Sequence, residues 1–351
     1  MDIRIRRLAS QGLSGDPERT PDAAVGRLLA VQAQDGRGFR LAVRSRTAGL
    51  SAGEVDAALD SRRLLVTWLN RGTLHLVRSE DYRWLHALTA PRVVRGVERR
   101  LGQLGVDVPV RERGVSVIVS SLQVDGPLDR RDLRDRLDDE GVPTAGQALV
   151  HLLALASLRG HVVRGPVIGG RHAFVAVDDW LGPSPAAVDR DEALGRIARR
   201  YLEGHGPATP RDLATWAGIT LGVARSAFDR VDVDLHDVPG GSVIGRVRPV
   251  DELPTAPARL LGPFDPILHG WHERSPFVGP HRSVVTANGI FRAACLVGGR
   301  VVGTWTLPGG SVEIALLERV GVRQQAALHR DAADVLRFLG RENAPVRVSG
   351  P

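Results

Sequence analysis

The sequence contains no lysine, because all 47 basic residues of this 351-residue chain are arginines. A lysine Schiff base at a carbonyl carbon is therefore excluded, and only an N-terminal amine could form one. The single cysteine, Cys295, excludes an internal disulfide framework and a cysteine-rich zinc site. A basic-then-apolar leader and an apolar run of about 18 residues are also missing, so we expect a cytoplasmic protein without a membrane partner.

Charge is unevenly distributed along the chain, which carries 47 basic and 40 acidic residues and a formal net charge of +7. Residues 1–100 hold 18 arginines and 11 acidic residues, and the remaining 29 of each kind balance, so the whole excess lies in this first part. A basic N-terminal third favours a polyanionic partner, with an ordinary solvated basic surface as the alternative. With 43% hydrophobic residues, the chain can bury a sizeable core divided over about two or three modules.

The first module, residues 1–105, is predicted to contain helices and one β-hairpin. Thr20 and Pro21 are typical of the start of a helix, and apolar residues then recur with helical spacing as far as Val31. Two apolar strands joined by a glycine-containing turn at residues 70–72 indicate the hairpin. The expected helices are 21–31, 51–59 and 79–88, the last ending near Pro91, and the expected strands are 64–69 and 73–77.

The remaining modules are predicted at residues 106–182, 188–250 and 255–351. In the second, three helices followed by a hairpin give the order of a winged helix-turn-helix, with Asp129 and Thr144 as helix caps. The third repeats this pattern, and the last is β-rich with a terminal helix. The expected helices are 114–122, 129–137, 145–158, 191–203, 209–217, 220–228 and 324–339, and the expected strands are 160–164, 172–177, 243–247, 284–286, 290–297, 300–305 and 311–316.

Two glutamines separated by one residue, Gln32 and Gln34, stand where the first apolar helix is expected to end. A buried amide without a partner costs about 1–3 kcal/mol, so the pair must satisfy backbone groups at a helix end or hold a polar ligand such as water. Residues two apart lie about 200° apart on a helix, so both amides reach one site only where the helix unwinds. We expect that point at Asp35 and Gly36. Asp35 could act on the water or cap backbone amides.

Several segments together resemble the AlkZ-like DNA glycosylases, a winged-helix family with a Gln-apolar-Gln signature. Gln32-Ala33-Gln34 matches this signature, and Arg71-Gly72-Thr73-Leu74-His75 matches a second run of the family. Residues 261–271, 288–292 and 299–305 are also similar to family segments, so the resemblance spans nearly the whole chain.

The resemblance implies an α+β fold in which three tandem winged helix-turn-helix modules form a C shape around a small C-terminal β-barrel. It also implies a monomeric, monofunctional glycosylase that hydrolyses the N-glycosidic bond of alkylated purines in double-stranded DNA without a cofactor. Bulky N7-alkylguanine adducts are the expected substrates, with interstrand crosslinks as a further class. Another branch resembles this chain but carries aspartate in place of Gln34. The chain is thus nearer to the branch linked with self-resistance to genotoxic natural products, and DNA repair is its expected role.

The resemblance assigns catalysis to Gln32, Gln34 and Asp35. Neutral amides suit the positioning of water, and a carboxylate suits a sugar that becomes positively charged. The alternatives for the DNA-binding candidates are a solvated arginine face and, for Thr73 and His75, ordinary strand positions. No further ligand completes a metal site around His269, His272 and His281. The DNA-binding candidates are Arg37, Arg40, Arg44, Arg71, Thr73, His75, His281, Arg282 and Asn288.

A non-catalytic DNA-binding transcriptional regulator is the main alternative function. Winged helices without an enzyme could place recognition helices in the major groove while arginines bind phosphates. Such regulators are usually dimers on palindromic sites, so a defined operator sequence would favour this alternative. A catalytically inactive lesion sensor is a third possibility, which only lesion binding without base release would reveal.

Overall fold

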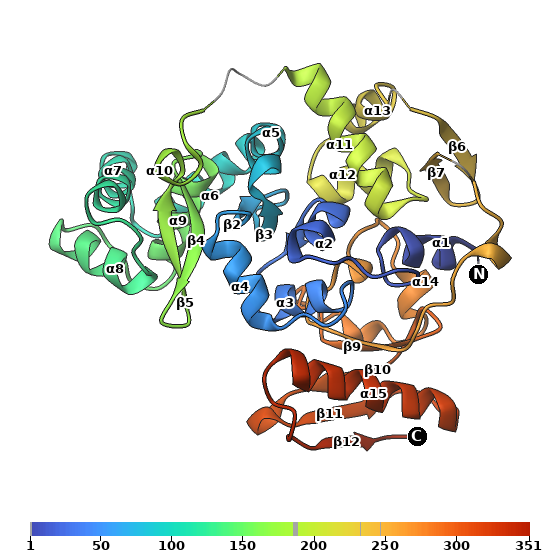
Figure 1. The fold of residues 1–351 in the computed structure, drawn as a ribbon. Helices are drawn as coiled ribbons and strands as arrows, with labels where there is room; N and C mark the ends of the chain where they lie inside the picture. The colour runs from blue at the N-terminus through green and yellow to red at the C-terminus, as the bar shows by residue number, and fades with distance from the viewer. Residues whose placement is uncertain (1, 185–188, 232, 246) are drawn as a thin grey trace. The chain divides into compact units, whose positions relative to one another are not determined.

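The computed structural model describes residues 2–184, 189–231, 233–245 and 247–351 (Figure 1). Its elements pack into two units, each with its own core. The first unit consists of Met1–Val55, Leu194–Trp216 and Thr220–Pro351, and the second of Asp56–Ala193 and Ala217–Ile219. Val188, the expected start of the third module, and Arg246, within the expected strand 243–247, lie outside the described residues.

The first unit begins with α1 (Asp2–Ser10) and α2 (Pro21–Leu28), followed by β1 (Val31–Gln32) and α3 (Gly36–Arg44). Thr20 caps α2 as predicted, since its hydroxyl accepts a hydrogen bond from the Ala23 amide at 3.2 Å. The predicted helix 21–31 was too long: α2 stops because Leu29 adopts a φ of 62°, which no α-helix contains. The chain is therefore extended where the two glutamines follow.

The middle of the chain adds α11 (Arg190–His205), α12 (Pro210–Ala217) and α13 (Leu221–Phe228). These helices lie where the sequence predicted them, and the Thr220 hydroxyl caps α13 by accepting from the Val223 amide at 3.3 Å. A short antiparallel hairpin of β6 (Leu235–Val238) and β7 (Gly241–Ile244) follows. The order of three helices and a hairpin thus recurs here.

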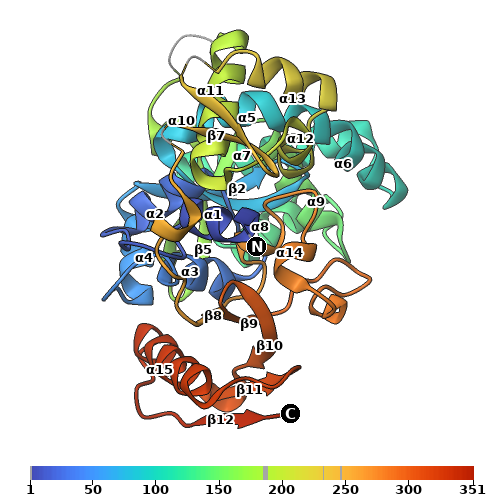
Figure 2. The same ribbon diagram turned by 90° about the vertical axis from the view of Figure 1, so that its right-hand side faces the viewer.

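A five-stranded sheet in the order β12-β11-β10-β9-β8 completes the first unit. Only the β11–β12 pair is parallel among the pairings described for this sheet. In the described part of the chain the edge strands do not pair with each other, so the sheet is open and the expected closed barrel is wrong. Helix α15 (Val322–Phe338) packs beside β8 and β12 (Figure 2). The strands are β8 (Arg259–Leu261), β9 (Ala294–Val297), β10 (Arg300–Thr306), β11 (Val312–Leu316) and β12 (Val346–Ser349).

Short helical turns connect these strands, and one of them replaces a predicted strand. Residues 284–286 were expected to be extended, but the 3-10 turn Arg282–Val284 occupies their start. The other turns are Val250–Glu252, Pro266–Leu268, α14 (Ser275–Val278) and Pro308–Gly310.

The second unit is built on strands in the order β3-β2-β4-β5. The predicted hairpin is confirmed as β2 (Leu64–Leu69) and β3 (Thr73–Arg78), with Thr67 opposite His75. Pro91 was expected to end a helix, yet it begins α6 (Pro91–Gln103), because a proline needs no amide hydrogen bond in the first turn. The other elements are α4 (Ala52–Asp60), α5 (Ser79–Thr89), α7 (Val108–Asp125), α8 (Arg130–Asp139), α9 (Ala148–Leu158), β4 (Val162–Ile168), β5 (Arg171–Ala176) and α10 (Val177–Leu181).

Helices α7, α8 and α9 followed by the β4–β5 hairpin give the predicted winged-helix order. Asp129 caps α8 in a reciprocal capping box with Asp132, as its position predicts. Helix α7 starts earlier than expected because the Asp107 side chain accepts from the Val110 amide at 3.1 Å. Thr144 does not cap α9; its hydroxyl donates to the Asp138 carboxylate at 2.5 Å, and α9 starts only at Ala148.

Helix α9 lies in the core of the second unit. Its residues 148–149 and 152–158 are all buried, and they pack with side chains of α6 and α7. This packing makes α9 the central helix of the core of the second unit. None of the helices in the described residues is both long and apolar enough to cross a membrane.

Candidate active site

Gln32 ends the short strand β1, and Gln34 lies in the bend between β1 and α3. Both residues thus lie outside the helices, so they can share a site without the unwinding that a helix would require. They are in contact: Gln32 Nε2 donates a hydrogen bond to Gln34 Oε1. Gln32 is 4% exposed, whereas Gln34 is exposed to solvent. Gln32 therefore lies in the protein interior, and Gln34 lies at the surface.

This hydrogen bond determines which polar groups the pair offers to a ligand. It uses an amide hydrogen of Gln32 and the carbonyl oxygen of Gln34. The carbonyl oxygen of Gln32 remains to accept a hydrogen bond, and the amide group of Gln34 remains to donate one. A water molecule is matched by one acceptor and one donor, and neither amide can take up its proton. The arrangement can position a nucleophilic water but cannot act as a general base.

The local backbone conformation at Leu29 ends α2 before the glutamines. Leu28 and Leu29 are both fully buried, and Leu29 has its φ in the left-handed region, which is uncommon for a bulky residue. Such a backbone conformation costs about 1–3 kcal/mol and persists where surrounding packing imposes it. This strain lies three residues before Gln32, directly after the last residue of α2.

Asp35 caps the helix that follows the glutamines. Its carboxylate accepts a hydrogen bond from the Gly38 amide at 2.6 Å, and its backbone is extended, as expected for the residue before a helix. Asp35 and Gly36 were predicted to end the preceding helix, but they form the start of α3. The capping role is observed; a second role of the carboxylate toward water stays a prediction.

Residues of the segment 261–266 contact α3 and the residues that follow it. A Cβ atom on Gly38 would lie 2.4 Å from the Pro263 carbonyl oxygen, so only glycine permits this approach. At the other end of the helix, Arg46 and Asp265 form a fully buried ion pair with an N–O distance of 2.9 Å. Both ends of the helix that follows the Gln-Ala-Gln motif are thus fixed by one distant segment.

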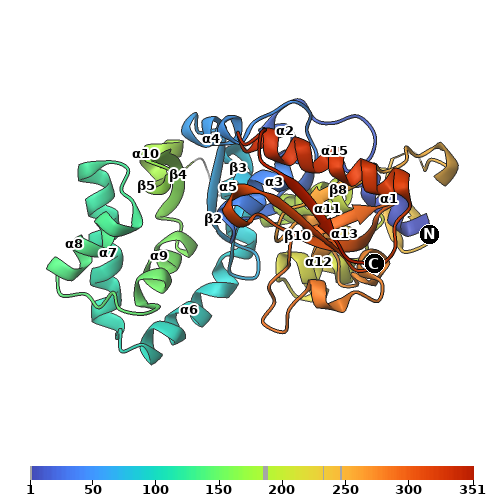
Figure 3. The ribbon, with the colours of Figure 1, turned by 90° about the horizontal axis from the view of Figure 1, so that it is seen from below.

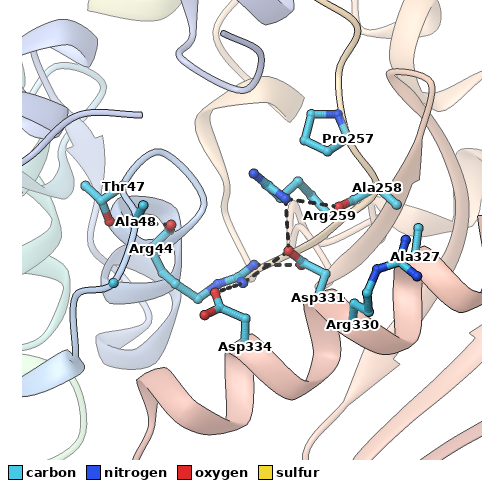
Figure 4. A pocket seen from close by; sticks show the side chains of 11 residues that line it. Arg44, Thr47, Ala48, Pro257, Ala258, Arg259, Ala327, Arg330, Asp331 and Asp334 are labelled. Carbon is cyan, nitrogen blue, oxygen red and sulfur yellow. Dashed lines mark hydrogen bonds and ion pairs between the residues drawn. The ribbon is translucent and has the colours of Figure 1, made fainter. Parts of the chain in front are cut away.

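Arg44 is not available to DNA, and this predicted contact was wrong. Its side chain is 3% exposed and lies 2.9 Å from both Asp331 and Asp334 (Figure 4). Burial alone would lower the pKa of Arg44, but the two carboxylates outweigh this effect and raise it. Asp331 also accepts from Arg259, at 3.2 Å. Arg44, Arg259, Asp331 and Asp334 line a cavity of about 340 Å³, and their ion pairs join α3 to α15.

Arg37 and Arg40 lie on the first turns of α3. Arg37 is exposed, as a phosphate contact requires. Arg40 is partly exposed; its guanidinium donates to the Gly36 carbonyl and lies 4.6 Å from the ring centre of Phe39. Arg37 is therefore the better placed of the two for an approaching anion.

In the second unit, the β2–β3 hairpin carries Arg71, Thr73 and His75. Arg71 is exposed at the turn, Thr73 is half-buried, and His75 is 1% exposed. The His75 ring Nδ1 lies 2.9 Å from the Thr73 carbonyl oxygen, which selects the tautomer with a hydrogen on Nδ1. His75 is thus a fixed ring within the hairpin, and Arg71 is the accessible charge.

Asn70 is a candidate that the sequence did not reveal. It is 1% exposed with a φ of 47°, and neither polar atom of its side-chain amide has a hydrogen-bond partner among the described residues. The buried Thr73 hydroxyl next to this turn also lacks a partner there. An unsatisfied buried group costs about 1–3 kcal/mol, so Asn70 and Thr73 are polar groups that an ordered water or a polar ligand would stabilise. The Asn-Arg-Gly sequence indicated only a turn.

His281, Arg282 and Asn288 lie in the first unit. His281 is half-buried, with its Nε2 2.9 Å from a Glu318 carboxylate oxygen, so this ring is engaged within the protein. Arg282 and Asn288 are exposed and remain accessible. No group of three or more His, Cys, Asp or Glu side chains within the described ranges could hold a metal ion.

Comparison with known proteins covers almost the entire chain. A family model described as "DNA glycosylase AlkZ-like" matches residues 25–338. An "Interstrand DNA cross-link repair glycosylase" from Streptomyces sahachiroi is 29% identical over 363 aligned positions, covering 95% of this chain and 95% of the relative. The solved structure of Streptomyces sahachiroi DNA glycosylase AlkZ superposes with a TM-score of 0.76 at 26% identity, covering 99% of this chain and 98% of that one.

Proposed function

The chain belongs to the AlkZ-like DNA glycosylase family and is a DNA glycosylase; we propose that it hydrolyses the N-glycosidic bond of alkylated purines in double-stranded DNA, chiefly bulky N7-alkylguanines. The relative from Streptomyces sahachiroi is named for interstrand cross-link repair, which supports bulky and crosslinked adducts as the substrate class. A role in DNA repair or in self-resistance to a genotoxic natural product follows from such a substrate. The protein is proposed to act as a monomer.

The contact between Gln32 and Gln34 carries this proposal. An N7-alkylated guanine is cationic and leaves readily, so the enzyme needs no strong general acid. The Gln32 carbonyl accepts a hydrogen bond from the water, and the Gln34 amide donates one to it, holding the water for attack on C1′. The oxygen–C1′ bond forms as the C1′–N9 bond breaks, its electron pair leaves with the base and neutralises it, and the water proton passes to solvent. The Asp35 carboxylate stabilises the positive sugar in the transition state.

We further propose that winged-helix modules hold the duplex through exposed polar groups. Arg37, Arg71 and Arg282 are exposed arginines suited to phosphate oxygens, and Asn288 offers a neutral donor. Contacts to phosphate fix the position of the protein on DNA without reading its sequence, which fits an enzyme directed at a lesion.

The test uses duplexes that carry one N7-methylguanine or one bulky N7-guanine adduct. Purified enzyme is incubated with each, and alkali then cleaves the abasic sites. We expect alkali-dependent cleavage whose single-turnover rate falls by about 100-fold in Gln32→Ala/Gln34→Ala, because the water is no longer held in place. Gln123→Ala/Gln325→Ala removes two glutamines outside the motif and should retain the full rate.

The outcomes separate the parts of the proposal. Release of the bulky base alone would narrow the substrate class. Release that persists at the full rate in Gln32→Ala/Gln34→Ala would overturn the catalytic assignment. Binding of either duplex by the wild type without any base release would overturn the proposed substrate.

A further inference from the structure

Helix α6 presents three arginines on the side opposite its buried face. At 100° per residue, Arg92, Arg95 and Arg99 fall within about 60° of the helix circumference, and Leu101 lies on the opposite side. Leu101 is fully buried, whereas all three arginines are exposed. Figure 3 shows α6 at the edge of the second unit, packed on α9. We call this row of Arg92, Arg95 and Arg99 the α6 stripe.

The charge of the α6 stripe is not neutralised within the protein. The one acid of this helix, Glu98, points elsewhere and is held by Arg159 at 3.0 Å and Arg111 at 3.7 Å. Arg92, Arg95 and Arg99 form no ion pair with the residues that the structure describes. Three adjacent positive charges therefore face solvent without a counter-charge.

The stripe is open to a large ligand. Gly96 and Gly102 lie on the same side of the helix, and a Cβ atom added at either would meet no atom within 4 Å. These two glycines have no side chain that would prevent a broad surface from approaching the three arginines. From Arg92 to Arg99 the helix advances about 10.5 Å, and the long arginine side chains extend beyond this span, so the row can reach neighbouring phosphates of one DNA strand.

The stripe adjoins the hairpin turn that carries Arg71. A Cβ atom on Gly72 would lie 2.7 Å from Val93 Cγ1, so the turn rests directly on the first turn of α6. The exposed Arg71 thus extends the row of positive charges toward the Arg-Gly-Thr-Leu-His segment of the hairpin. Both elements belong to the second unit.

We propose that the α6 stripe binds the phosphate backbone of undamaged duplex beside the lesion. The inference rests on the proposed function in that DNA is the ligand, but it concerns binding rather than chemistry. Each phosphate neutralised by an arginine releases bound counterions, so the stripe contributes affinity that declines as salt rises. It adds no sequence preference.

The experiment measures the affinity for an undamaged duplex over a series of salt concentrations. Arg92→Gln/Arg95→Gln/Arg99→Gln should reduce the slope of log affinity against log salt by about 2.7, at about 0.9 for each lost phosphate contact. The matched control, Arg319→Gln/Arg323→Gln/Arg330→Gln, removes the same charge from exposed arginines elsewhere and should keep the wild-type slope. Thermal unfolding verifies that both variants fold.

Base release at saturating enzyme is followed in parallel. In the α6 variant the enzyme concentration needed for saturation should rise with the loss of affinity, whereas Gln32→Ala/Gln34→Ala should lose base release but keep the wild-type salt slope. An unchanged slope in the α6 variant, or an equal change in the control, would overturn the inference. Absence of base release from the wild-type enzyme would instead count against the proposed function and leave the comparison of slopes intact.

Discussion

At the scale of single residues, arginine has two roles: a buried arginine forms ion pairs within the protein, and an exposed arginine is accessible to DNA. Arg44 is buried against two carboxylates, while Arg37, seven positions earlier on the same helix, is exposed. Breaking a buried ion pair costs about 3–5 kcal/mol, because the remaining charge is left without a partner. Arg44 therefore stabilises the fold. Exposed arginines such as Arg37 can bind DNA phosphates without the loss of a buried ion pair.

His205 makes the stability of the protein sensitive to acid. Its ring is fully buried and stacks on Tyr201 at a centroid distance of 4.5 Å. Burial lowers the pKa of His205 from 6.5 to about 3. Between these two values the unfolded chain binds a proton that the folded chain does not, so stability falls as pH falls through this window. The contribution is fully present above pH 6.5.

We expect His205 to lower the free energy of unfolding by about 2 kcal/mol between pH 7.5 and pH 5, at about 1.4 kcal/mol per pH unit below the unfolded pKa. Urea unfolding at the two pH values measures this difference. In His205→Phe the difference should shrink by about the same amount, whatever the stability of the variant at neutral pH. An identical pH dependence in the two proteins would contradict the assignment.

At the scale of elements, the position of the glutamines depends on how α3 is held. Gly38 allows the first turn of α3 to touch Pro263, and a Cβ atom would lie 2.4 Å from the Pro263 carbonyl oxygen. In Gly38→Ala the start of the helix must move, and with it Asp35 and the extended segment that precedes it.

We expect Gly38→Ala to lower the single-turnover rate of base release by about 10- to 100-fold, since a shift of about 1 Å is enough to misplace a nucleophile. The affinity for undamaged duplex should change little. Gly53→Ala, at an exposed position of helix α4 where the nearest atom is 3.8 Å away, is the matched control and should retain full activity. Equal rates in the two variants would show that α3 does not position the glutamines.

Elements predicted by local signals alone were correctly placed. The β2–β3 hairpin follows from two apolar strands and a glycine turn, and the cap at Asp129 follows from an acidic residue before a helical pattern. The end of α2 was misplaced because its apolar pattern continues to Val31, while the buried Leu29 takes a conformation that the pattern does not encode. The helix cap predicted at Thr144 was wrong, because the Thr144 hydroxyl donates a hydrogen bond to the Asp138 carboxylate.

At the scale of the whole molecule, the absence of lysine leaves no lysine amine that could form a Schiff base with DNA, so we expect base release by hydrolysis. Cleavage of the strand after base release commonly uses an amine that forms a Schiff base with the opened sugar. We expect intact strands before alkali treatment, and no enzyme–DNA adduct when sodium borohydride is added during base release. A trapped adduct would show that an N-terminal amine reacts, and a variant with a blocked N-terminus would test this.

The sequence by itself determined the chemistry that the chain can offer: no lysine, one thiol, two glutamines separated by one residue, and arginine as the only permanently charged basic side chain. It also determined the order of the helices and the hairpins of the second and third modules, because periodicity and capping are local. Only the tertiary structure decided that the two glutamine side chains are in contact outside a helix, that α9 lies in a core, and that Arg44 is paired with residues 287 and 290 positions away. These outcomes depend on contacts between distant parts of the chain, and burial decides whether a charge meets a carboxylate or solvent.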